Sequence, residues 1–230
     1  MKLKKIKYFT KTELAIWIGS IILIVSAFFI FDGKKYLNMI ASLVGTTALI
    51  FCAKGNPLGQ AFMIIFASLY AYISLSFKYY GEMITYLGMS LPMSIVAFIS
   101  WLKNPSKESK AEVKVNTLSK KEMLFGFIVA LVVTVIFYFI MRELGTSNLV
   151  ISTVSITTSF FAAYLTFRRC EYFALAYALN DIVLIIMWIM ATIKNISYIS
   201  VIICFLVFLV NDTYSYLNWK KMKERQRDAE

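Results

Sequence analysis

The sequence contains no histidine, and it has only three cysteines and three prolines in 230 residues. The absence of imidazole excludes histidine-based catalysis, histidine proton relays and histidine metal ligands. The cysteines are odd in number and lack metal-ligand spacing, so neither a disulfide framework nor a metal site is expected. A Walker A glycine loop and Ser–His or Cys–His pairs are also missing. These absences predict a protein without a metal, a cofactor or enzymatic activity.

Charged residues are scarce as well, at 16% of the chain, where soluble domains reach about 25%. Hydrophobic residues make up 60%, and the mean hydropathy is +0.71. Long uncharged runs alternate with short charged clusters, which predicts an all-α polytopic protein of the lipid bilayer. A net charge of +11 would suggest a nucleic-acid partner in a soluble protein. Here the basic residues flank apolar runs as topology signals do, so no nucleic-acid binding is expected.

Eight apolar runs are long enough to span a membrane, which takes about 20 residues. They cover residues 13–31, 36–53, 59–77, 83–102, 121–141, 148–167, 172–193 and 197–218. The first run is longer than the apolar part of a signal peptide. It ends in Phe28–Asp32, where small residues would mark a cleavage site. We therefore expect a retained transmembrane helix there and eight transmembrane helices in total.

The basic residues predict the orientation of the chain. If the N-terminus is cytoplasmic, 19 of the 24 Lys and Arg residues fall in cytoplasmic segments and 5 in outer segments. Cytoplasmic segments of membrane proteins carry such an excess. Both termini are therefore predicted to be cytoplasmic, which an even number of spans also requires.

An internal repeat emerges when the chain is aligned with itself at an offset of 118 residues. The offset matches mainly residues near helix ends: Trp101 with Trp219, Lys103 with Lys221, Tyr80 with Tyr198 and Tyr70 with Trp188. It places three helices of the first half on three helices of the second half, running in the same direction. Parallel repeats of this kind occur in transporters, which hold substrate near the membrane midplane between the two halves.

The repeat predicts a single membrane transporter domain over residues 1–230. Residues 36–102 form the first three-helix bundle, and residues 148–218 form the second. The helix at 121–141 links them and makes the repeat parallel. The helix at 13–31 is an extra N-terminal helix outside the repeat.

Two Asn-Asp pairs interrupt the last two apolar runs, Asn180-Asp181 and Asn211-Asp212. An ionisable side chain at bilayer depth is costly, and it is a functional-site hypothesis by default. At 1.5 Å per residue, Asp181 lies about 15 Å and Asp212 about 12 Å from the cytoplasmic ends of their helices. We therefore expect the two carboxylates at similar depth.

Neighbouring residues could complete a binding site around these carboxylates. Tyr177, Asp181 and Trp188 share one stripe of their helix. Aromatic faces beside a carboxylate suit a flat, cationic or hydroxyl-bearing ligand. The repeat also superposes Asp212 on Ser94, which lies just after Pro92.

Polar residues in membrane helices have a second role, because they also join helices by hydrogen bonds. For Asn180 and Asn211 this alternative is as well supported as substrate binding. For the two Asp residues we favour function, since burying a charge only to join helices is costly. Glu13, at the inner end of the first helix, is expected at the membrane interface. Three charged residues at helix ends are expected in solvent: Lys54, Glu82 and Glu171.

Several short motifs occur in a fixed order along the two halves. The first half holds Tyr80-Gly81-Glu82, Leu91-Pro92-Met93-Ser94 and Trp101, and the second holds Tyr177-x-x-x-Asp181, Trp188, Asn211-Asp212-x-Tyr214 and Asn218-Trp219. In order and spacing the chain resembles PnuC-type vitamin transporters, whose best-known substrate is nicotinamide riboside. Two positions differ from that family. Its Trp-x-x-x-Asn pattern reads Tyr177 and Asp181 here, and Ser94 replaces a common Gln.

The resemblance implies a SWEET-like fold and facilitated diffusion of nicotinamide riboside across a bacterial inner membrane, with trapping by phosphorylation inside. It also implies a set of substrate-binding residues: Tyr177 and Trp188 for the ring, Asp181 and Asp212 for hydroxyls or charge, and Asn180, Asn211 and Ser94 for further hydrogen bonds. Thiamine and riboflavin are alternative substrates. Ion-coupled transport and a sensory subunit are alternative functions, and a homo-oligomer is compatible with the sequence.

Overall fold

The computed structural model of the protein describes residues 8–34, 36–76, 80–146, 148–193 and 196–229. Within these ranges every named element is helical: α1 (Lys11–Ala27), η1 (Phe28–Asp32), α2 (Tyr36–Ala53), α3 (Leu58–Ser76), α4 (Tyr80–Thr85), η2 (Tyr86–Ser90), α5 (Leu91–Lys103), α6 (Lys120–Glu143), α7 (Leu149–Phe167), α8 (Phe173–Thr192), η3 (Ile196–Tyr198) and α9 (Ile199–Asp228). The elements η1 and η2 are π-helical turns, and η3 is a 3₁₀ turn.

Eight helical segments in the described part of the chain are long and apolar enough to span a membrane. In them α1 continues into η1, and α4, η2 and α5 form one span. The prediction of an all-α protein with eight spans is confirmed, although the predicted end of the third span at residue 77 lies outside the described residues. The last helix is longer than predicted and reaches Asp228 instead of residue 218. Its extension consists of good helix formers without Gly or Pro, so nothing in the sequence stops it.

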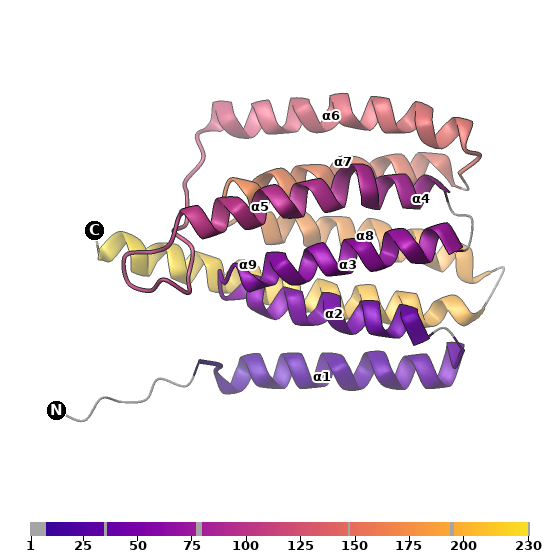
Figure 1. The fold of residues 1–230 in the computed structure, drawn as a ribbon, viewed down its shortest axis with the longest axis horizontal. Coiled ribbons are helices and arrows are strands. Elements are labelled where there is room, and N and C mark those ends of the chain that lie inside the picture. Colours follow the sequence, from indigo (N-terminus) through magenta and orange to yellow (C-terminus); the bar gives the residue numbers. More distant parts are fainter. Residues whose placement is uncertain (1–7, 35, 77–79, 147, 194–195, 230) are drawn as a thin grey trace.

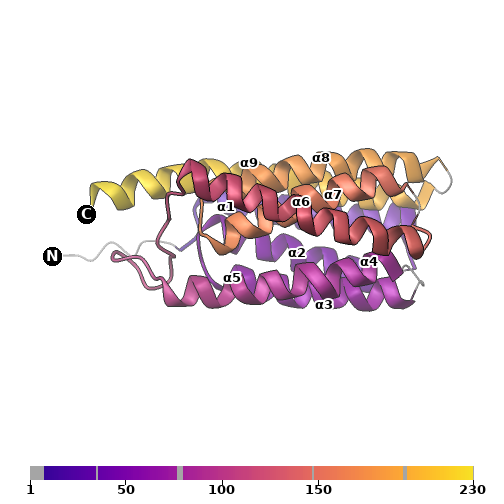
Figure 2. The same cartoon turned by 90° about the horizontal axis from the view of Figure 1, so that it is seen from above.

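Six spans form a ring in which each helix packs on the next (Figures 1 and 2). The order of contact is α2, α3, α5, α7, α8, α9 and back to α2. Outside the ring, α1 packs on α2 and α9, and α6 packs on α7. This arrangement is consistent with two three-helix bundles: α2, α3 and α4–α5 as the first, and α7, α8 and α9 as the second. We call the end where α1 begins and α9 ends the N/C end, and the opposite one the distal end.

Glycines let neighbouring helices approach closely at two contacts. A Cβ atom on Gly59 of α3 would lie 2.6 Å from the backbone nitrogen of Cys52 on α2. A Cβ atom on Gly126 of α6 would lie 2.2 Å from Cε1 of Tyr164 on α7. Small residues at helix contacts in membranes allow this close packing. Gly126 therefore sets the distance between the linker helix α6 and the second bundle.

The fourth span contains the π-helical turn η2 directly before Leu91-Pro92. Proline has no N–H to donate, and in an α-helix its ring clashes with the carbonyl four residues earlier, here that of Gly88. A π turn widens the helix locally, so it accommodates Pro92 within a continuous span. A proline within a helix is expected to distort it, but the π-helical form of this distortion does not follow from the sequence.

Two carboxylates at the N/C end are buried in ion pairs. Glu13 is 2% exposed and lies 3.0 Å from Nζ of Lys54, and Glu171 is 4% exposed and lies 2.5 Å from Nζ of Lys223. The prediction that Lys54 and Glu171 are solvated is therefore wrong. The position of Glu13 and Glu171 at helix ends favours exposure, but neighbouring helices cover both carboxylates in the tertiary structure. Glu82 is half-buried, and Ser74 donates to its Oε2 at 3.5 Å.

The loop between α5 and α6, residues 104–119, covers the N/C end (Figure 1). Val113 is fully buried and its N–H donates to the carbonyl of Gly55 at 2.9 Å. The N–H of Asn116 donates to the carbonyl of Arg169, also at 2.9 Å. The loop is therefore fixed to the first bundle through Gly55 and to the second through Arg169.

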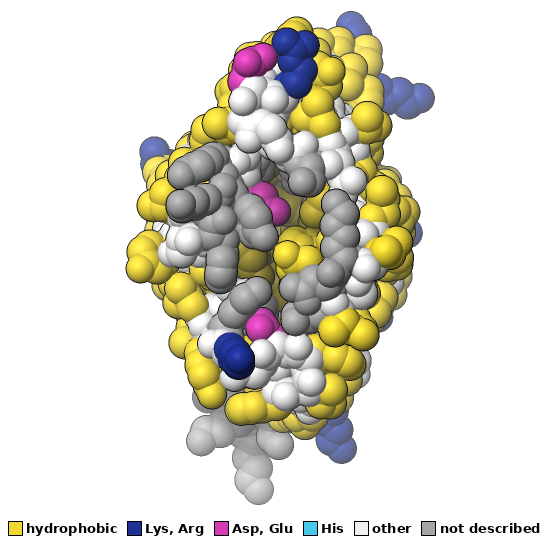
Figure 3. All heavy atoms as spheres, turned by 90° about the vertical axis from the view of Figure 1, so that its right-hand side faces the viewer, with side chains coloured by type: hydrophobic (Ala, Val, Ile, Leu, Met, Phe, Trp, Pro, Cys, Tyr) yellow, Lys and Arg dark blue, Asp and Glu magenta, His cyan; other side chains and the backbone are white. Residues whose placement is uncertain are grey.

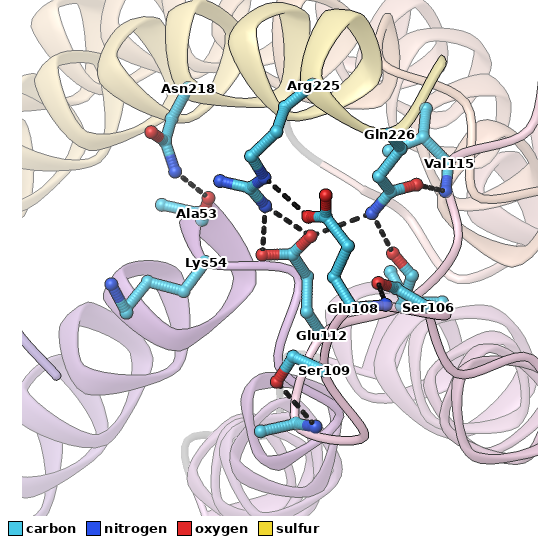
Figure 4. Close-up of polar contacts among 12 residues, drawn as sticks. Ala53, Lys54, Ser106, Glu108, Ser109, Glu112, Val115, Asn218, Arg225 and Gln226 are labelled. Atoms are coloured by element: carbon cyan, nitrogen blue, oxygen red, sulfur yellow. Dashed lines mark hydrogen bonds and ion pairs between the residues drawn. The ribbon is translucent and has the colours of Figure 1, made fainter. Parts of the chain in front are cut away.

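The end of α9 fastens the same loop (Figure 4). Arg225 forms ion pairs with Glu108 and Glu112. Gln226 accepts a hydrogen bond from the N–H of Val115 at 2.8 Å, and its amide donates to Glu112 at 2.7 Å. The part of α9 beyond residue 218, which the sequence does not predict as helix, thus has a structural role. It holds the loop that connects the two bundles.

Candidate functional site

Asp181 on α8 and Asp212 on α9 lie against each other inside the helix bundle. Their carboxyl groups are in hydrogen-bonding contact. The side chains are almost fully buried, with exposed fractions of 4% and 3%. Because α8 and α9 pack side by side, residues at similar depth can meet. The sequence-based prediction that the two carboxylates share a depth is confirmed, and we call them the acid pair.

Each member of the acid pair keeps one buried oxygen for which the described residues offer no hydrogen-bond partner, Asp181 Oδ2 and Asp212 Oδ1. Asn211 Oδ1 and Ser215 Oγ, on the same helix as Asp212, are also buried and unpartnered. Buried polar atoms in proteins almost always have partners, so each such atom calls for an explanation. A polar or cationic ligand received at the acid pair would satisfy these oxygens.

The two asparagines beside the acid pair hold helices together. Asn180 accepts hydrogen bonds through Oδ1 from Thr158 at 2.7 Å and from Ser155 at 3.3 Å, both on α7. Asn211 donates through Nδ2 to Ser20 Oγ on α1 at 3.0 Å. Of the two roles left open by the sequence, these contacts favour helix joining for Asn180. Asn211 also joins helices, but its Oδ1 stays available to a ligand.

The two aromatic residues predicted to hold a ring lie on opposite sides of the acid pair. Tyr177 packs into the core of the N/C end, with its ring centroid 6.4 Å from that of Phe173. Trp188 lies toward the distal end and packs on Tyr198, with centroids 5.1 Å apart. Eleven residues of α8 separate them, which is about 16 Å. One planar ring therefore cannot contact both side chains in this conformation.

The remaining predicted site residue, Ser94, is half-buried on α5. Among the residues that the structure describes, no contact between Ser94 and the acid pair is recorded. The repeat that superposes it on Asp212 relates equivalent places in the two bundles, and such places need not touch. Its predicted role in substrate binding remains a prediction.

A cavity of about 90 Å³ opens at the distal end between α1, α2, α3, α4, α8 and α9. Figure 3 shows acidic side chains bordering a hollow on this end of the molecule. The described lining includes two carboxylates, no Lys or Arg, and four aromatic rings: Asp32, Glu82, Phe28, Tyr70, Trp188 and Tyr198. Cys204 also lines the cavity and lies within electrostatic range of Asp181. One residue of the cavity lining is therefore within electrostatic range of the acid pair, although neither Asp181 nor Asp212 lines the cavity itself.

The N/C end is closed by two reciprocal contacts between the bundles. Trp101 on α5 donates its indole N–H to the carbonyl of Thr166 on α7 at 2.9 Å. Trp219 on α9 donates its indole N–H to the carbonyl of Cys52 on α2 at 2.8 Å. Both indoles are fully buried, and their ring centroids are 5.3 Å apart. The last carbonyls of a helix lack partners within it, so each bundle caps a helix of the other.

The residues before the two tryptophans repeat the arrangement. Ser100 Oγ donates to the carbonyl of Phe167, and Asn218 Nδ2 donates to the carbonyl of Ala53, both at 2.8 Å (the second is drawn in Figure 4). Ser100 and Asn218 are related by the same offset of 118 residues that relates the tryptophans. The weak sequence repeat therefore corresponds to equivalent contacts in the structure.

Sequence reasoning missed the distal cavity. The sequence predicts Glu82 in solvent, and it marks Asp32 only as the end of the first apolar run. The alignment of Tyr70 with Trp188 did bring two residues of this lining together, since both face the cavity. A one-dimensional pattern could not reveal the cavity itself, because its walls come from six helices far apart in the chain.

The chain is similar to known proteins over nearly its whole length. Residues 35–221 match the family described as nicotinamide mononucleotide transporter. The chain is 30% identical over 216 residues to the nicotinamide riboside transporter PnuC of Neisseria mucosa, which covers 92% of this chain and 82% of that protein. It is 24% identical over 211 residues to the protein of the same name from Haemophilus influenzae, covering 91% and 90%.

The fold is also similar to a solved one. The crystal structure of the vitamin B3 transporter PnuC superposes with a TM-score of 0.80 at 26% sequence identity. The superposition covers 95% of this chain and 94% of that one. Sequence and fold therefore point to the same relatives.

Proposed function

The chain belongs to the nicotinamide mononucleotide transporter family, and on this basis we propose that it carries nicotinamide riboside across a bacterial inner membrane. Family membership confirms the resemblance to PnuC-type transporters and the prediction of a transporter in place of an enzyme. The names of the relatives differ in one respect. The family is named for the mononucleotide, and the curated relatives are named for the riboside.

One observation carries the choice of substrate: a distal cavity lined by aromatic rings and carboxylates, whose lining residue Cys204 lies within electrostatic range of the buried Asp181. Nicotinamide riboside is a flat ring with a positive charge, joined to a sugar with hydroxyl groups. Asp181 and Asp212 can balance the charge or accept hydrogen bonds from hydroxyls. Aromatic faces such as those of Tyr70 and Trp188 attract cations on their way into the site.

Electrostatics favour the riboside over the mononucleotide. The mononucleotide adds a phosphate group, which carries a charge of about −1.5 to −2 near neutral pH. The described cavity lining contains Asp32 and Glu82 and no basic side chain that could pair with a phosphate. The acid pair offers no positive charge either. A phosphorylated ligand would therefore be repelled by the carboxylates of the cavity and would find no basic partner in the described lining.

The same argument supports facilitated diffusion with trapping inside the cell. We place the N/C end in the cytoplasm, as the distribution of Lys and Arg predicts. The described conformation would then be open to the outside and closed toward the cytoplasm by Trp101 and Trp219. Rocking of one bundle against the other would open the cytoplasmic side. A substrate phosphorylated in the cytoplasm could not return through an acidic path.

The seven predicted substrate-binding residues then take different roles in the proposal. Asp181 and Asp212 bind the substrate directly, and Asn211 Oδ1 adds an acceptor. Trp188 contacts the ring during entry, and Tyr177 contacts it only after the N/C end opens. Asn180 holds α7 and α8 together beside the site, and Ser94 keeps its predicted role as a further hydrogen-bond partner of the substrate.

Equilibrium binding to purified protein tests the proposal. The ligand panel is nicotinamide riboside, nicotinamide mononucleotide, thiamine and riboflavin, and the variants are Asp181→Asn and Asp212→Asn. We expect the riboside to bind and each variant to weaken binding by about 10- to 100-fold, since hydrogen bonds to charged groups contribute about 1.5–3 kcal/mol. Glu143→Gln is the control, because Glu143 is an exposed carboxylate at the distal end. Unchanged affinity in both Asp variants, or preferred binding of the mononucleotide, would refute the proposal.

Flux into liposomes that contain only this protein separates transport from sensing. A transporter moves labelled riboside down its gradient without any partner, whereas a sensory subunit binds it without flux. If uptake required an imposed ion gradient, the ion-coupled alternative would replace facilitated diffusion.

A further inference from the structure

The acid pair lacks a basic partner within the described part of the chain. The ion pairs there involve other carboxylates: Glu13, Glu108, Glu112, Glu122, Glu143, Glu171 and Asp228. At contact distance in a medium of low dielectric constant, two negative charges repel strongly. A buried charge without a partner is also costly, and such a group usually becomes neutral. The empty site therefore needs protons to exist in the described conformation.

The groups around the acid pair supply no positive charge that could stabilise two ionised carboxylates. Tyr177 on α8 and Cys52 on α2 lie within electrostatic range of Asp212, and Cys204 on α9 lies within electrostatic range of Asp181. The helices α7 and α1 contribute hydroxyl groups that bond the neighbouring asparagines: Thr158 to Asn180 and Ser20 to Asn211. On α3, Tyr70 lies within electrostatic range of Cys204 and Glu82. Phenols, thiols and alcohols are uncharged near neutral pH.

The nearest charged side chains described on the surrounding helices lie farther toward either end. Glu13 of α1 is paired with Lys54 at the N/C end. Glu82 of α4 and Asp32 of η1 line the distal cavity. These distal carboxylates supply no positive charge that could pair with Asp181 or Asp212.

We propose that the acid pair holds protons when the site is empty and releases one of them when a cationic substrate binds. Binding is then an exchange of a proton for the positive charge of the ligand. This inference rests on the proposed function, because it needs a cationic substrate. It goes further, since it predicts that protons take part in each binding event.

The exchange balances in charge. In the empty site both carboxyl groups are neutral, and one donates a hydrogen bond to the other. When the cation enters, one O–H bond breaks and its proton leaves through the open distal cavity into water. The remaining carboxyl group keeps its proton and donates a hydrogen bond to the new carboxylate. The site is therefore neutral before binding and, with its ligand, neutral afterwards.

A comparison of two ligands isolates the effect of charge. The dihydro form of nicotinamide riboside has nearly the same shape, but its ring is uncharged. The oxidised riboside should release a proton on binding, and the dihydro form should release none. This ligand control leaves the protein unchanged and so avoids variants that fold poorly.

Calorimetry measures the exchange directly. Titrations of the full-length protein with nicotinamide riboside are run at several pH values, each in two buffers that differ in ionisation enthalpy. We expect up to one proton to be released per bound riboside. The dissociation constant should fall by up to tenfold for each unit that the pH is raised, as long as the empty pair is protonated. A dissociation constant independent of pH, with equal heats in both buffers, would overturn the inference and leave the proposed function intact.

Infrared spectroscopy tests the empty site without any ligand. The wild-type protein should show an absorption from buried protonated carboxyl groups that is missing in the double variant Asp181→Asn/Asp212→Asn. Adding the riboside should reduce this absorption in the wild type. If the riboside does not bind, the proposed function fails, and the spectrum of the empty protein still decides whether the pair is protonated. An identical carboxyl absorption in both proteins would overturn the inference.

Discussion

Trp101 and Trp219 occupy equivalent positions in the two bundles, and each donates its indole N–H to a helix-terminal carbonyl of the opposite bundle. Their rings also pack on each other at the N/C end. The bundles are thus held together at one end by a pair of matching contacts and separated at the other by a cavity. Movement of one bundle against the other must break or shift both contacts.

Replacing either tryptophan by phenylalanine should make the N/C end open more often. Trp219→Phe removes the indole donor to the carbonyl of Cys52, which keeps its second hydrogen bond from the N–H of Gly55. The lost hydrogen bond costs about 0.5–1.5 kcal/mol. Labelling of Cys52, which is 2% exposed, reports on opening. In a background of Cys170→Ala and Cys204→Ala we expect labelling by a thiol reagent to become about two- to tenfold faster, since about 1.4 kcal/mol corresponds to a factor of ten.

Trp17→Phe is the matched control for this experiment. Trp17 also donates an indole hydrogen bond, to Thr47 Oγ1 at 3.3 Å, but it lies on α1 outside the ring of helices. Its loss should leave the labelling rate unchanged. Equal rates in the Trp219→Phe, Trp101→Phe and control proteins would show that the tryptophans do not hold this end closed.

Asn180→Ala should lower stability without weakening substrate binding. The variant removes the acceptor for the hydroxyl groups of Thr158 and Ser155, which join α7 to α8. Hydrogen bonds between membrane helices contribute about 0.6 kcal/mol on average and up to about 1.7 kcal/mol. Thermal unfolding in detergent should show a small decrease in midpoint, while Leu179→Ala, at a side chain 54% exposed on the outer face of α8, should show a smaller one. A loss of riboside affinity at unchanged stability would instead make Asn180 a binding residue.

Arg225→Gln should loosen the loop between α5 and α6. Arg225 forms ion pairs with Glu108 and Glu112, and it is half exposed, so its effect on global stability should stay below about 1 kcal/mol. The loop carries Lys107, Lys110 and Lys114, whose side chains are exposed. We expect faster cleavage of the loop by trypsin in native protein, because local opening exposes the backbone.

Arg227→Gln controls for the loss of one basic residue. Arg227 is exposed, and its partner, Asp228, lies next to it in the sequence, so the loop does not depend on it. If both variants are cleaved at the wild-type rate, the ion pairs do not fasten the loop.

Gly126→Ala should destabilise the contact between α6 and α7. The added Cβ atom would lie 2.2 Å from Cε1 of Tyr164, so the helices or the ring must move. Overpacking of this kind costs about 1–3 kcal/mol. Gly19→Ala is the control, since a Cβ atom there meets no atom within 4 Å and alanine favours the helix by up to about 1 kcal/mol. Thermal unfolding should separate the two variants, and equal midpoints would contradict the close packing.

The features of this protein that can be predicted are those that depend only on the local sequence of each helix. Each apolar run is long enough to span a bilayer, and an even count of spans agrees with the basic residues at both ends. The depth of Asp181 and Asp212 followed from counting residues along two straight helices. These properties need no knowledge of which helix lies beside which.

Other features depend on tertiary contacts that no single helix contains. Glu171 sits at a helix end, where solvent exposure was the natural expectation, but Lys223 from the extension of α9 covers it. The cavity takes its walls from six helices, so Asp32 and Glu82 could not be recognised as neighbours. Tyr177 and Trp188 share a stripe of α8, yet the stripe runs from the closed end to the open cavity.

The length of α9 links the acid pair mechanically to the water-exposed loop. Its 30 residues extend about 45 Å, well beyond the roughly 30 Å of the hydrocarbon core. Asp212 and Arg225 lie on this one unbroken rod, roughly 20 Å apart. A shift of α9 at Asp212 would therefore be transmitted along the helix to Arg225, beyond the membrane-spanning part. A reporter group attached near Arg225 would sense ligand binding at the acid pair without occupying the site.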